Sequence, residues 1–164
     1  MSLPSSTHSP YPLARTAIGE EFTTDLGEQY VIYFSDASEY FKGLDVARHA
    51  FMLGFMRLTE NEDNEDDTPP HDPRISATIL QVLERFFEDN RKVMAYVCQS
   101  GKREKYRHRL FTLWFSRYNN SRFVRHVSSE TEGLFAAIIY SKNSPYAWEL
   151  QQKLPSMEDK LTFY

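Results

Sequence analysis

The sequence contains a single cysteine, Cys98, among its 164 residues. One thiol cannot form an intramolecular disulfide, so a disulfide-stapled scaffold is excluded and a reducing compartment is favoured. No apolar run approaches the roughly 20 residues that a bilayer-spanning helix needs. The stretch MSLPSSTHSPYPLA at positions 1–14 has neither the basic start nor the apolar core of a secretory signal. We therefore expect a cytoplasmic protein with no membrane partner.

Metal-ligand patterns are also missing. The histidines at positions 8, 49, 71, 108 and 126 show no ligand spacing with one another or with Cys98. The acidic segment 59–71, TENEDNEDDTPPH, lacks the central glycine of a calcium-binding loop. We therefore predict no metal site, and we interpret residues 59–71 as a solvated acidic loop.

The composition is that of an ordinary folded protein, with 41% hydrophobic, 15% aromatic and 26% charged residues. A chain of this length is long enough to bury a core. Serine and proline are frequent at the start, which favours a flexible N-terminal arm over residues 1–15. We expect residues 16–164 to form one domain that includes the acidic loop.

Hydrophobic patterning predicts the order β-β-β-α-β-α-β-β-α. The expected elements are a hairpin over 19–35, a long strand over 46–58, a helix from 72 to about 90, a strand over 93–98, a helix over 101–118, a hairpin over 122–141 and a last helix from 144. Gly54 suggests a bulge in the long strand, and Trp148 is expected to dock the last helix. The predicted fold class is α+β with a mainly antiparallel sheet.

Three of these elements carry local signals. The first hairpin is expected to turn at residues 25–27, Asp-Leu-Gly. Asp72 is expected to cap the first helix, which is amphipathic with an apolar stripe from Ile75 to Phe87. The strand over 93–98 is apolar on both alternating faces, as expected of a central strand covered by helices.

Charge is distributed unevenly along the chain. Residues 1–90 carry 17 acids and 6 bases, whereas residues 91–164 carry 6 acids and 13 bases. Such a separation is typical of a surface for nucleic acid or for an acidic partner. It is also what results when two halves of a fold neutralise each other, and the sequence leaves both interpretations open.

The most unusual stretch is QSGKREKYRHRLFTLWF, residues 99–115, in which five basic side chains precede an apolar run. Positive charge is unfavourable at the start of a helix, where the backbone dipole is itself positive. At about 100° per residue, Arg103 and Arg107 fall on the apolar face, whereas Lys102, Lys105 and Arg109 face water. Two inward arginines need carboxylates, carbonyls, aromatic rings or a bound anion as partners.

Three interpretations of these arginines stay open. The first is structural, with an ion pair to one of the acids Glu20, Glu21, Asp25 and Glu28, or packing of the guanidinium on a tyrosine. The second is an anion site in which the first-turn N–H groups and basic side chains hold a phosphate or carboxylate. Its residues would be Ser100, Lys102, Arg103, Arg107 and Arg109. The third is a duplex-binding surface made of Lys102, Lys105, Arg109, Arg122 and Arg125.

The predicted order of elements resembles the core of GNAT-type N-acetyltransferases. In that family a glycine-rich loop after the long strand holds the pyrophosphate of acetyl-CoA. The corresponding stretch here is D-P-R-I-S-A-T-I, residues 72–79, in which Arg74 and Ala77 match the pattern and both glycines are absent. The resemblance therefore implies a truncated, degenerate acetyltransferase-like fold. Acetyl-CoA is the cofactor that it would imply, and with the glycines missing we expect no cofactor.

A second resemblance covers residues 72–115. The D-P-R-I helix start, the double phenylalanine, the Y-x-C strand end and the R-x-x-L-F-x-x-W-F helix are similar to a small family of uncharacterised bacterial proteins. This resemblance implies a bacterial domain of unknown function, and its pattern includes Arg107.

No general base or nucleophile stands out, so catalytic residues are unknown and we do not expect an enzyme. The leading hypothesis is a non-catalytic cytoplasmic protein that binds an anionic ligand or an acidic protein partner through residues 100–109. The alternatives are a degenerate acetyltransferase-like enzyme or binder of a CoA-type ligand, and a nucleic-acid-binding protein.

Overall fold

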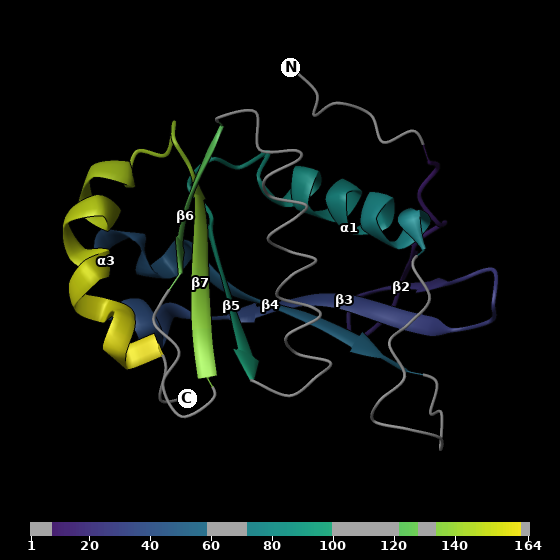
Figure 1. Ribbon diagram of the computed structural model, residues 1–164. Coiled ribbons are helices and arrows are strands. Elements are labelled where there is room, and N and C mark those ends of the chain that lie inside the picture. The colour runs from purple at the N-terminus through teal and green to yellow at the C-terminus, as the bar shows by residue number, and fades with distance from the viewer. Residues whose placement is uncertain (1–7, 59–71, 100–121, 128–133, 162–164) are drawn as a thin grey trace.

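The computed structural model describes residues 8–58, 72–99, 122–127 and 134–161. One twisted sheet runs through the molecule, with helix α1 (Pro73–Phe86) and helix α3 (Ala147–Leu161) packed against it (Figure 1). Within these residues, no helix is long and apolar enough to cross a membrane.

The seven strands lie in the order β1-β2-β3-β4-β5-β7-β6. Their bounds are β1 Ala14–Arg15, β2 Glu20–Thr23, β3 Gln29–Asp36, β4 Ala50–Arg57, β5 Val93–Gln99, β6 Phe123–Val127 and β7 Leu134–Ser141. Two 3₁₀ helices, η1 Ser38–Phe41 and η2 Asp45–His49, connect β3 to β4. Every neighbouring pair is antiparallel except β4 and β5. The predicted α+β class with a mainly antiparallel sheet is confirmed, whereas the expected helix 101–118 and the loop 59–71 lie outside the described residues.

The first predicted hairpin is confirmed as β2 and β3. Its turn is closed by hydrogen bonds from the Gly27 N–H to the Thr24 carbonyl and from the Thr24 N–H to the Glu28 carbonyl, at 2.9 and 2.8 Å. Gly27 has φ 81°, a conformation that glycine adopts without steric cost.

Part of the segment expected to be a flexible arm is packed on the domain. Tyr11 is only 3% exposed, and its ring stacks on Phe22 with centroids 5.7 Å apart. The Tyr11 N–H donates to Thr78 Oγ1 in α1 at 2.8 Å, and Ala14 and Arg15 pair with β2. Residues 8–15 therefore differ from that expectation, because one large aromatic side chain supplies the anchor that the serine-rich composition hides.

Helix α1 begins where the sequence indicates. The Asp72 carboxylate accepts a hydrogen bond from the Arg74 N–H at 2.9 Å, and Pro73 occupies the first helical position. Ile79, Val82 and Phe86 are buried against the sheet. The predicted amphipathic helix is confirmed, and it ends at Phe86 rather than near Asn90.

Strand β5 is buried on both faces. Met94 and Tyr96 belong to the core under α1, whereas Val93 and Ala95 belong to a second core that contains Leu150 and Leu154 of α3. Because successive strand side chains point to opposite faces, α1 and α3 cover opposite sides of the sheet. The prediction of a central strand covered by helices is confirmed.

No bulge interrupts the pairing of β4 with β3 at Gly54, so the bulge prediction is wrong for this side of the strand. The register between β3 and β4 is continuous from Tyr30 opposite Arg57 to Asp36 opposite Phe51. Gly54 lies opposite Tyr33, and a Cβ atom added at Gly54 would overlap the Tyr33 ring. The glycine is therefore explained by a steric need, because the ring lies directly over its backbone.

The expectation that Trp148 docks the last helix is also wrong, because this side chain is 75% exposed. The anchors are Leu150 and Leu154, which are fully buried. The Val46 N–H also donates to Glu149 Oε1 at 3.3 Å and links η2 to α3. Trp148 is the largest apolar side chain near the helix start, but the turn of the helix places it on the outer face.

The explanation for Gly54 predicts that Gly54→Ala destabilises the protein. Overpacking against a fixed ring costs about 1–3 kcal/mol of unfolding free energy. Urea unfolding monitored by circular dichroism measures this cost. The cost should fall sharply in the Tyr33→Ala background, and an equal cost in both backgrounds would show that the ring is not the cause.

The anchors of α3 give a second prediction. Leu150→Ala should lower the unfolding free energy by about 2–5 kcal/mol, because it opens a cavity in a closed core. Trp148→Ala should change it by no more than about 0.5 kcal/mol, as expected for an exposed residue. Urea unfolding of both variants tests the assignment, which a larger loss in the tryptophan variant would contradict.

Candidate functional site

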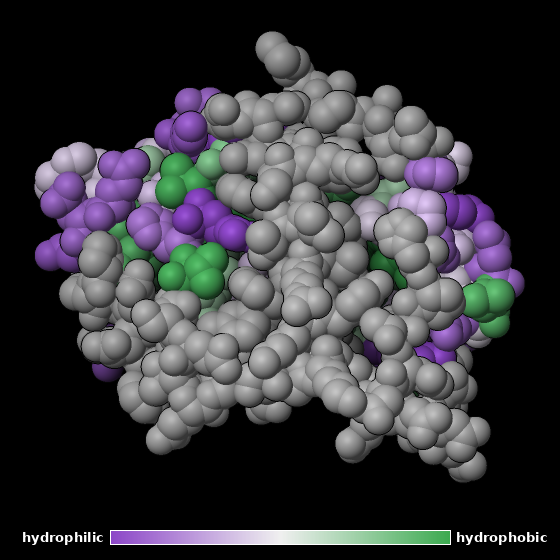
Figure 2. All heavy atoms as spheres, in the orientation of Figure 1, coloured by the Kyte–Doolittle hydropathy of each residue, from purple (hydrophilic) through white to green (hydrophobic). Residues whose placement is uncertain are grey.

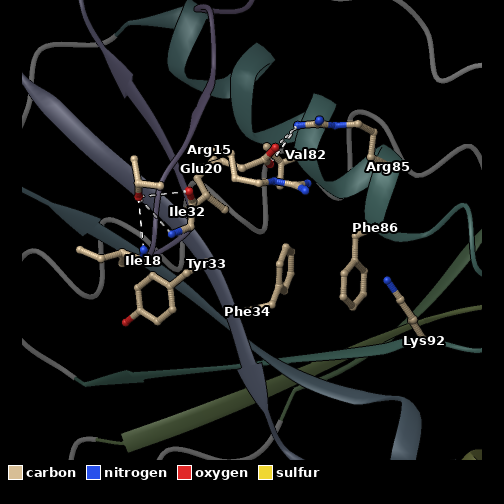
Figure 3. A pocket seen from close by; sticks show the side chains of 12 residues that line it. Arg15, Ile18, Glu20, Ile32, Tyr33, Phe34, Val82, Arg85, Phe86 and Lys92 are labelled. Atoms are coloured by element: carbon tan, nitrogen blue, oxygen red, sulfur yellow. Dashed lines mark hydrogen bonds and ion pairs between the residues drawn. The ribbon is translucent and has the colours of Figure 1, made fainter.

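A groove of about 380 Å³ lies beside the outer edge of β3. Its walls come from the turn between β1 and β2, from β3 and from α1 (Figure 3). The residues that line it are Arg15, Thr16, Ile18, Gly19, Glu20, Ile32, Tyr33, Phe34, Val82, Arg85, Phe86 and Lys92.

The floor of the groove is aromatic. Phe34 of β3 stacks on Phe86 of α1 with ring centroids 4.3 Å apart, and Figure 3 shows the two rings side by side. Phe51 meets Phe86 edge-on at 5.8 Å. The Lys92 ammonium lies 5.0 Å from the Phe86 centroid and 5.6 Å from the Phe51 centroid. Both distances lie within the range of a cation–π interaction, and the charge of Lys92 also attracts the Asp89 carboxylate.

The groove carries more positive than negative charge. Arg85 donates to both oxygens of Glu20 at 2.8 and 2.9 Å, so the single carboxylate among the lining residues is already paired. Arg15 is exposed and forms no ion pair with another described residue. Among the lining residues, the three basic side chains Arg15, Arg85 and Lys92 therefore outnumber the one acidic side chain, Glu20.

The start of α1, where the acetyltransferase resemblance would place a pyrophosphate, is filled by the chain's own groups. Asp72 caps the helix and also accepts a hydrogen bond from the Tyr11 hydroxyl. Burial and this contact with Asp72 raise the pKa of Tyr11. The Arg74 guanidinium pairs with Asp25 at 3.1 Å and lies 3.9 Å from the Tyr11 ring centroid. The Asp72 carboxylate would therefore repel a phosphate at this helix start, and the Arg74 guanidinium is already paired with Asp25.

Strands β4 and β5 run parallel but stay paired over only three residues each. The pairs are Ala50 with Val93, Phe51 with Met94 and Met52 with Ala95. Beyond them the described residues of the two strands no longer pair with each other, and Figure 1 shows the strands diverging. The sheet is therefore opened between its two central strands.

The predicted anion site, made of Ser100, Lys102, Arg103, Arg107 and Arg109, lies outside the described residues. The structural interpretation of Arg103 and Arg107 gave them a sheet acid or a tyrosine ring as partner, and three of the four sheet acids have arginine partners elsewhere. Glu20 pairs with Arg85, Asp25 with Arg74 and Glu28 with Arg57, at 2.8, 3.1 and 2.7 Å. All three arginines belong to residues 1–90, so these pairs neutralise acids within the acidic half rather than between the halves.

His49 has a pKa below the ordinary value for histidine. Burial lowers its pKa, and the positive charges of Arg91 and Arg48 lower it further. Its Nε2 atom is buried and has no hydrogen-bond partner among the described residues, and its ring lies 5.5 Å from that of Tyr146. His49 does not line the groove. In the described parts of the chain, no three histidine, cysteine or acidic side chains come together as metal ligands.

The groove was not predicted from the sequence. Arg15, Arg85 and Lys92 come from three separate segments, so no motif or spacing links them. The amphipathic pattern of α1 does identify Phe86 as a residue that faces the sheet. Phe86 is one of the two stacked rings of the floor, and Phe34 is the other. The charge of the groove arises from chain folding and has no local signature.

A comparison with protein families matches residues 71–154 to a family model described as a family of unknown function (DUF6169). The matched region is slightly more than half of the chain and runs from the start of α1 into α3. The chain therefore belongs to this family of unknown function. No curated protein and no solved structure matches the sequence.

The environment of His49 predicts a loss of stability in acid. An unfolded histidine binds its proton near pH 6.5, whereas folded His49 resists protonation because its ring is partly buried and lies near Arg91 and Arg48. Below about pH 6.5 the unfolded state binds more protons than the folded state, so stability falls as the pH falls. Thermal melts between pH 8 and 5 measure the slope.

The variant His49→Gln should flatten that slope between pH 6.5 and 5.5, because glutamine does not titrate. The matched control His8→Gln changes an exposed histidine and should keep the wild-type slope. An unchanged slope in the His49 variant would assign the acid sensitivity to another group.

Proposed function

We propose that this protein is a non-catalytic binding protein that holds an anionic ligand or an acidic partner in the groove beside β3. The observation that carries the proposal is the placement of Arg15 and Lys92 around the Phe34–Phe86 floor, where the one lining carboxylate is already paired with Arg85. The single cysteine supports a cytoplasmic location, and the resemblance to bacterial proteins supports a bacterial source.

The chemistry of the groove indicates the kind of ligand. A guanidinium offers a fork of N–H donors that matches a carboxylate or a phosphate, and an ammonium adds a compact point charge. Two unit charges 4 Å apart attract by about 4 kcal/mol at the effective dielectric constant of a protein surface, before desolvation is subtracted. The aromatic floor adds a surface for an apolar group. The ligand that fits is therefore a carboxylate or phosphate attached to an apolar portion.

The lining residues do not support catalysis. They include no histidine and no cysteine, and the one carboxylate among them is held by Arg85. A nucleophile needs a base within hydrogen-bond reach, and the described lining residues offer no such pair. Binding is therefore favoured over chemistry.

A second candidate function is the binding of a CoA-type ligand by a degenerate acetyltransferase-like fold. The described order of the long strand β4, helix α1 and strand β5, on which the resemblance rests, supports this candidate. The filled start of α1 weighs against it, because Asp72 and Arg74 are engaged with Tyr11 and Asp25. The segment 100–109 stays a predicted second anion site, and a nucleic-acid surface that includes Arg122 and Arg125 stays the third alternative.

One thermal-shift experiment separates these candidates. Inorganic phosphate, citrate, acetyl-CoA and a short DNA duplex are each added to the wild type and to Arg15→Ala and Lys92→Met. Methionine keeps the stem of Lys92 over the rings but removes its charge. A ligand present at 100 times its dissociation constant stabilises the folded state by about 2.7 kcal/mol, so a bound anion raises the melting temperature.

We expect phosphate or citrate to stabilise the wild type, and the response to be lost in both groove variants. The matched control Lys42→Ala, which changes an exposed lysine that does not line the groove, should keep the response. Loss of the response only in Arg103→Ala and Arg107→Ala would instead place the site at residues 100–109. A response to acetyl-CoA alone would favour the second candidate, and absence of any response would refute anion binding.

A further inference from the structure

Strand β3 is longer than the strand that pairs with its outer edge. Strand β2 pairs with β3 only from Gln29 to Ile32, whereas β4 pairs with β3 from Tyr30 to Asp36. Residues Tyr33–Asp36 therefore have no strand neighbour on their outer side within the described residues. This segment, called the open edge below, borders the groove (Figure 3).

The hydrogen bonds of β3 show which backbone groups point outward at the open edge. The Glu28 carbonyl accepts from Thr24 on the β2 side, whereas the Gln29 carbonyl accepts from Leu58 on the β4 side. The backbone groups of a strand between two antiparallel neighbours alternate in this way. The N–H and C=O groups of Phe34 and Asp36 therefore point away from β4, into the space that β2 leaves empty.

The pairing of β2 with β3 ends next to Gly19, because the chain turns there. The Thr16 N–H donates to the Gly19 carbonyl at 2.8 Å, which closes the turn that leads from β1 into β2. A Cβ atom at Gly19 would overlap the Ile32 carbonyl, so only glycine lets the turn leave β3 this closely. The turn carries the chain away from the open edge instead of extending β2 along it.

The side chains around the open edge define what it can hold. Ile18 is 54% exposed and Phe34 is half-buried, so apolar surface lies beside the free backbone groups. Arg15 and Lys92 line the same groove, and its one lining carboxylate, Glu20, is paired with Arg85. The Asp36 carboxylate, at the end of the open edge, keeps its charge and accepts hydrogen bonds from the N–H and Oγ of Ser38. An unpaired strand edge flanked by positive charge is complementary to an extended chain that carries acidic residues.

We infer that the open edge of β3 binds an acidic peptide segment of a partner protein as an added strand. This inference rests on the function proposed above and names the partner class for the same groove. The backbone of the peptide pairs with the N–H and C=O groups of Phe34 and Asp36. The acidic side chains form the peptide row on the α1 face, toward Arg15 and Lys92, and the alternate side chains point to the opposite face of the sheet.

The test uses fluorescein-labelled hexapeptides in which glutamate and valine alternate, titrated against the full chain by fluorescence anisotropy. A matched set replaces glutamate by lysine. A third set consists of two glutamate peptides. One carries N-methyl groups on the odd-numbered amides, which point to one edge of the strand, and the other carries them on the even-numbered amides, which point to the other edge. N-methylation removes backbone donors from one edge of the peptide without changing its charge.

We expect the glutamate peptide to bind at least tenfold more tightly than the lysine peptide. Methylation of one amide row should weaken binding at least tenfold, and methylation of the other row should change it less than threefold. Arg15→Ala and Lys92→Met should each weaken binding of the glutamate peptide severalfold, and Lys42→Ala should not.

Other outcomes separate the inference from the function on which it rests. Equal loss or no loss for the two methylated rows, with charge discrimination and the Arg15 and Lys92 effects retained, would overturn strand addition but leave anion binding in the groove intact. No difference between the glutamate and lysine peptides, together with no thermal shift from phosphate or citrate, would overturn both.

Discussion

The exclusion of water from both faces of β5 is the constraint on which the rest of the fold depends. Its backbone is paired with β7 over the whole strand and with β4 over three residues, and its side chains alternate between two cores. Each core needs its own helix, so α1 and α3 are required on opposite sides of the sheet. The apolar run that begins at Val93 therefore organises elements up to about 60 residues away in sequence.

This arrangement also explains why the candidate site lies at the margin of the sheet. Strands β2 and β3 are far from α3, and α1 crosses only one face of them (Figure 1). The space-filling view places green apolar patches beside purple hydrophilic residues toward both sides of the molecule (Figure 2). Positive side chains gather beside β3 because the end of α1 and the start of β5 bring Arg85 and Lys92 there. The same packing that buries Phe86 brings these charges to the edge of its ring.

Local patterns predicted the parts of the fold that local chemistry decides. The cap at Asp72, the stripe from Ile75 to Phe86 and the turn at Gly27 each depend on residues a few positions apart, and each was found. Gly54 was misread because its reason, the Tyr33 ring, lies on a neighbouring strand. The prediction for Trp148 is wrong because it rested on the size of the side chain. The position of a residue around the helix decides whether it faces the sheet, and Trp148 lies on the outer face. The groove was missed because it joins residues from distant segments, and the basic segment that dominates the sequence lies outside the described residues.

Tyr11 connects three elements that are made at different times. Its N–H bonds to Thr78, and its hydroxyl meets both Asp72 and the backbone of Asp25. During synthesis from the N-terminus, the N–H of Tyr11 has no partner in α1 until Thr78, 67 residues later, has been added. The segment around Tyr11 is thus made before its partners in α1, and contacts of such long sequence separation are among the slower ones to form. Packing of this segment on α1 therefore has to wait until the strands between them have been made.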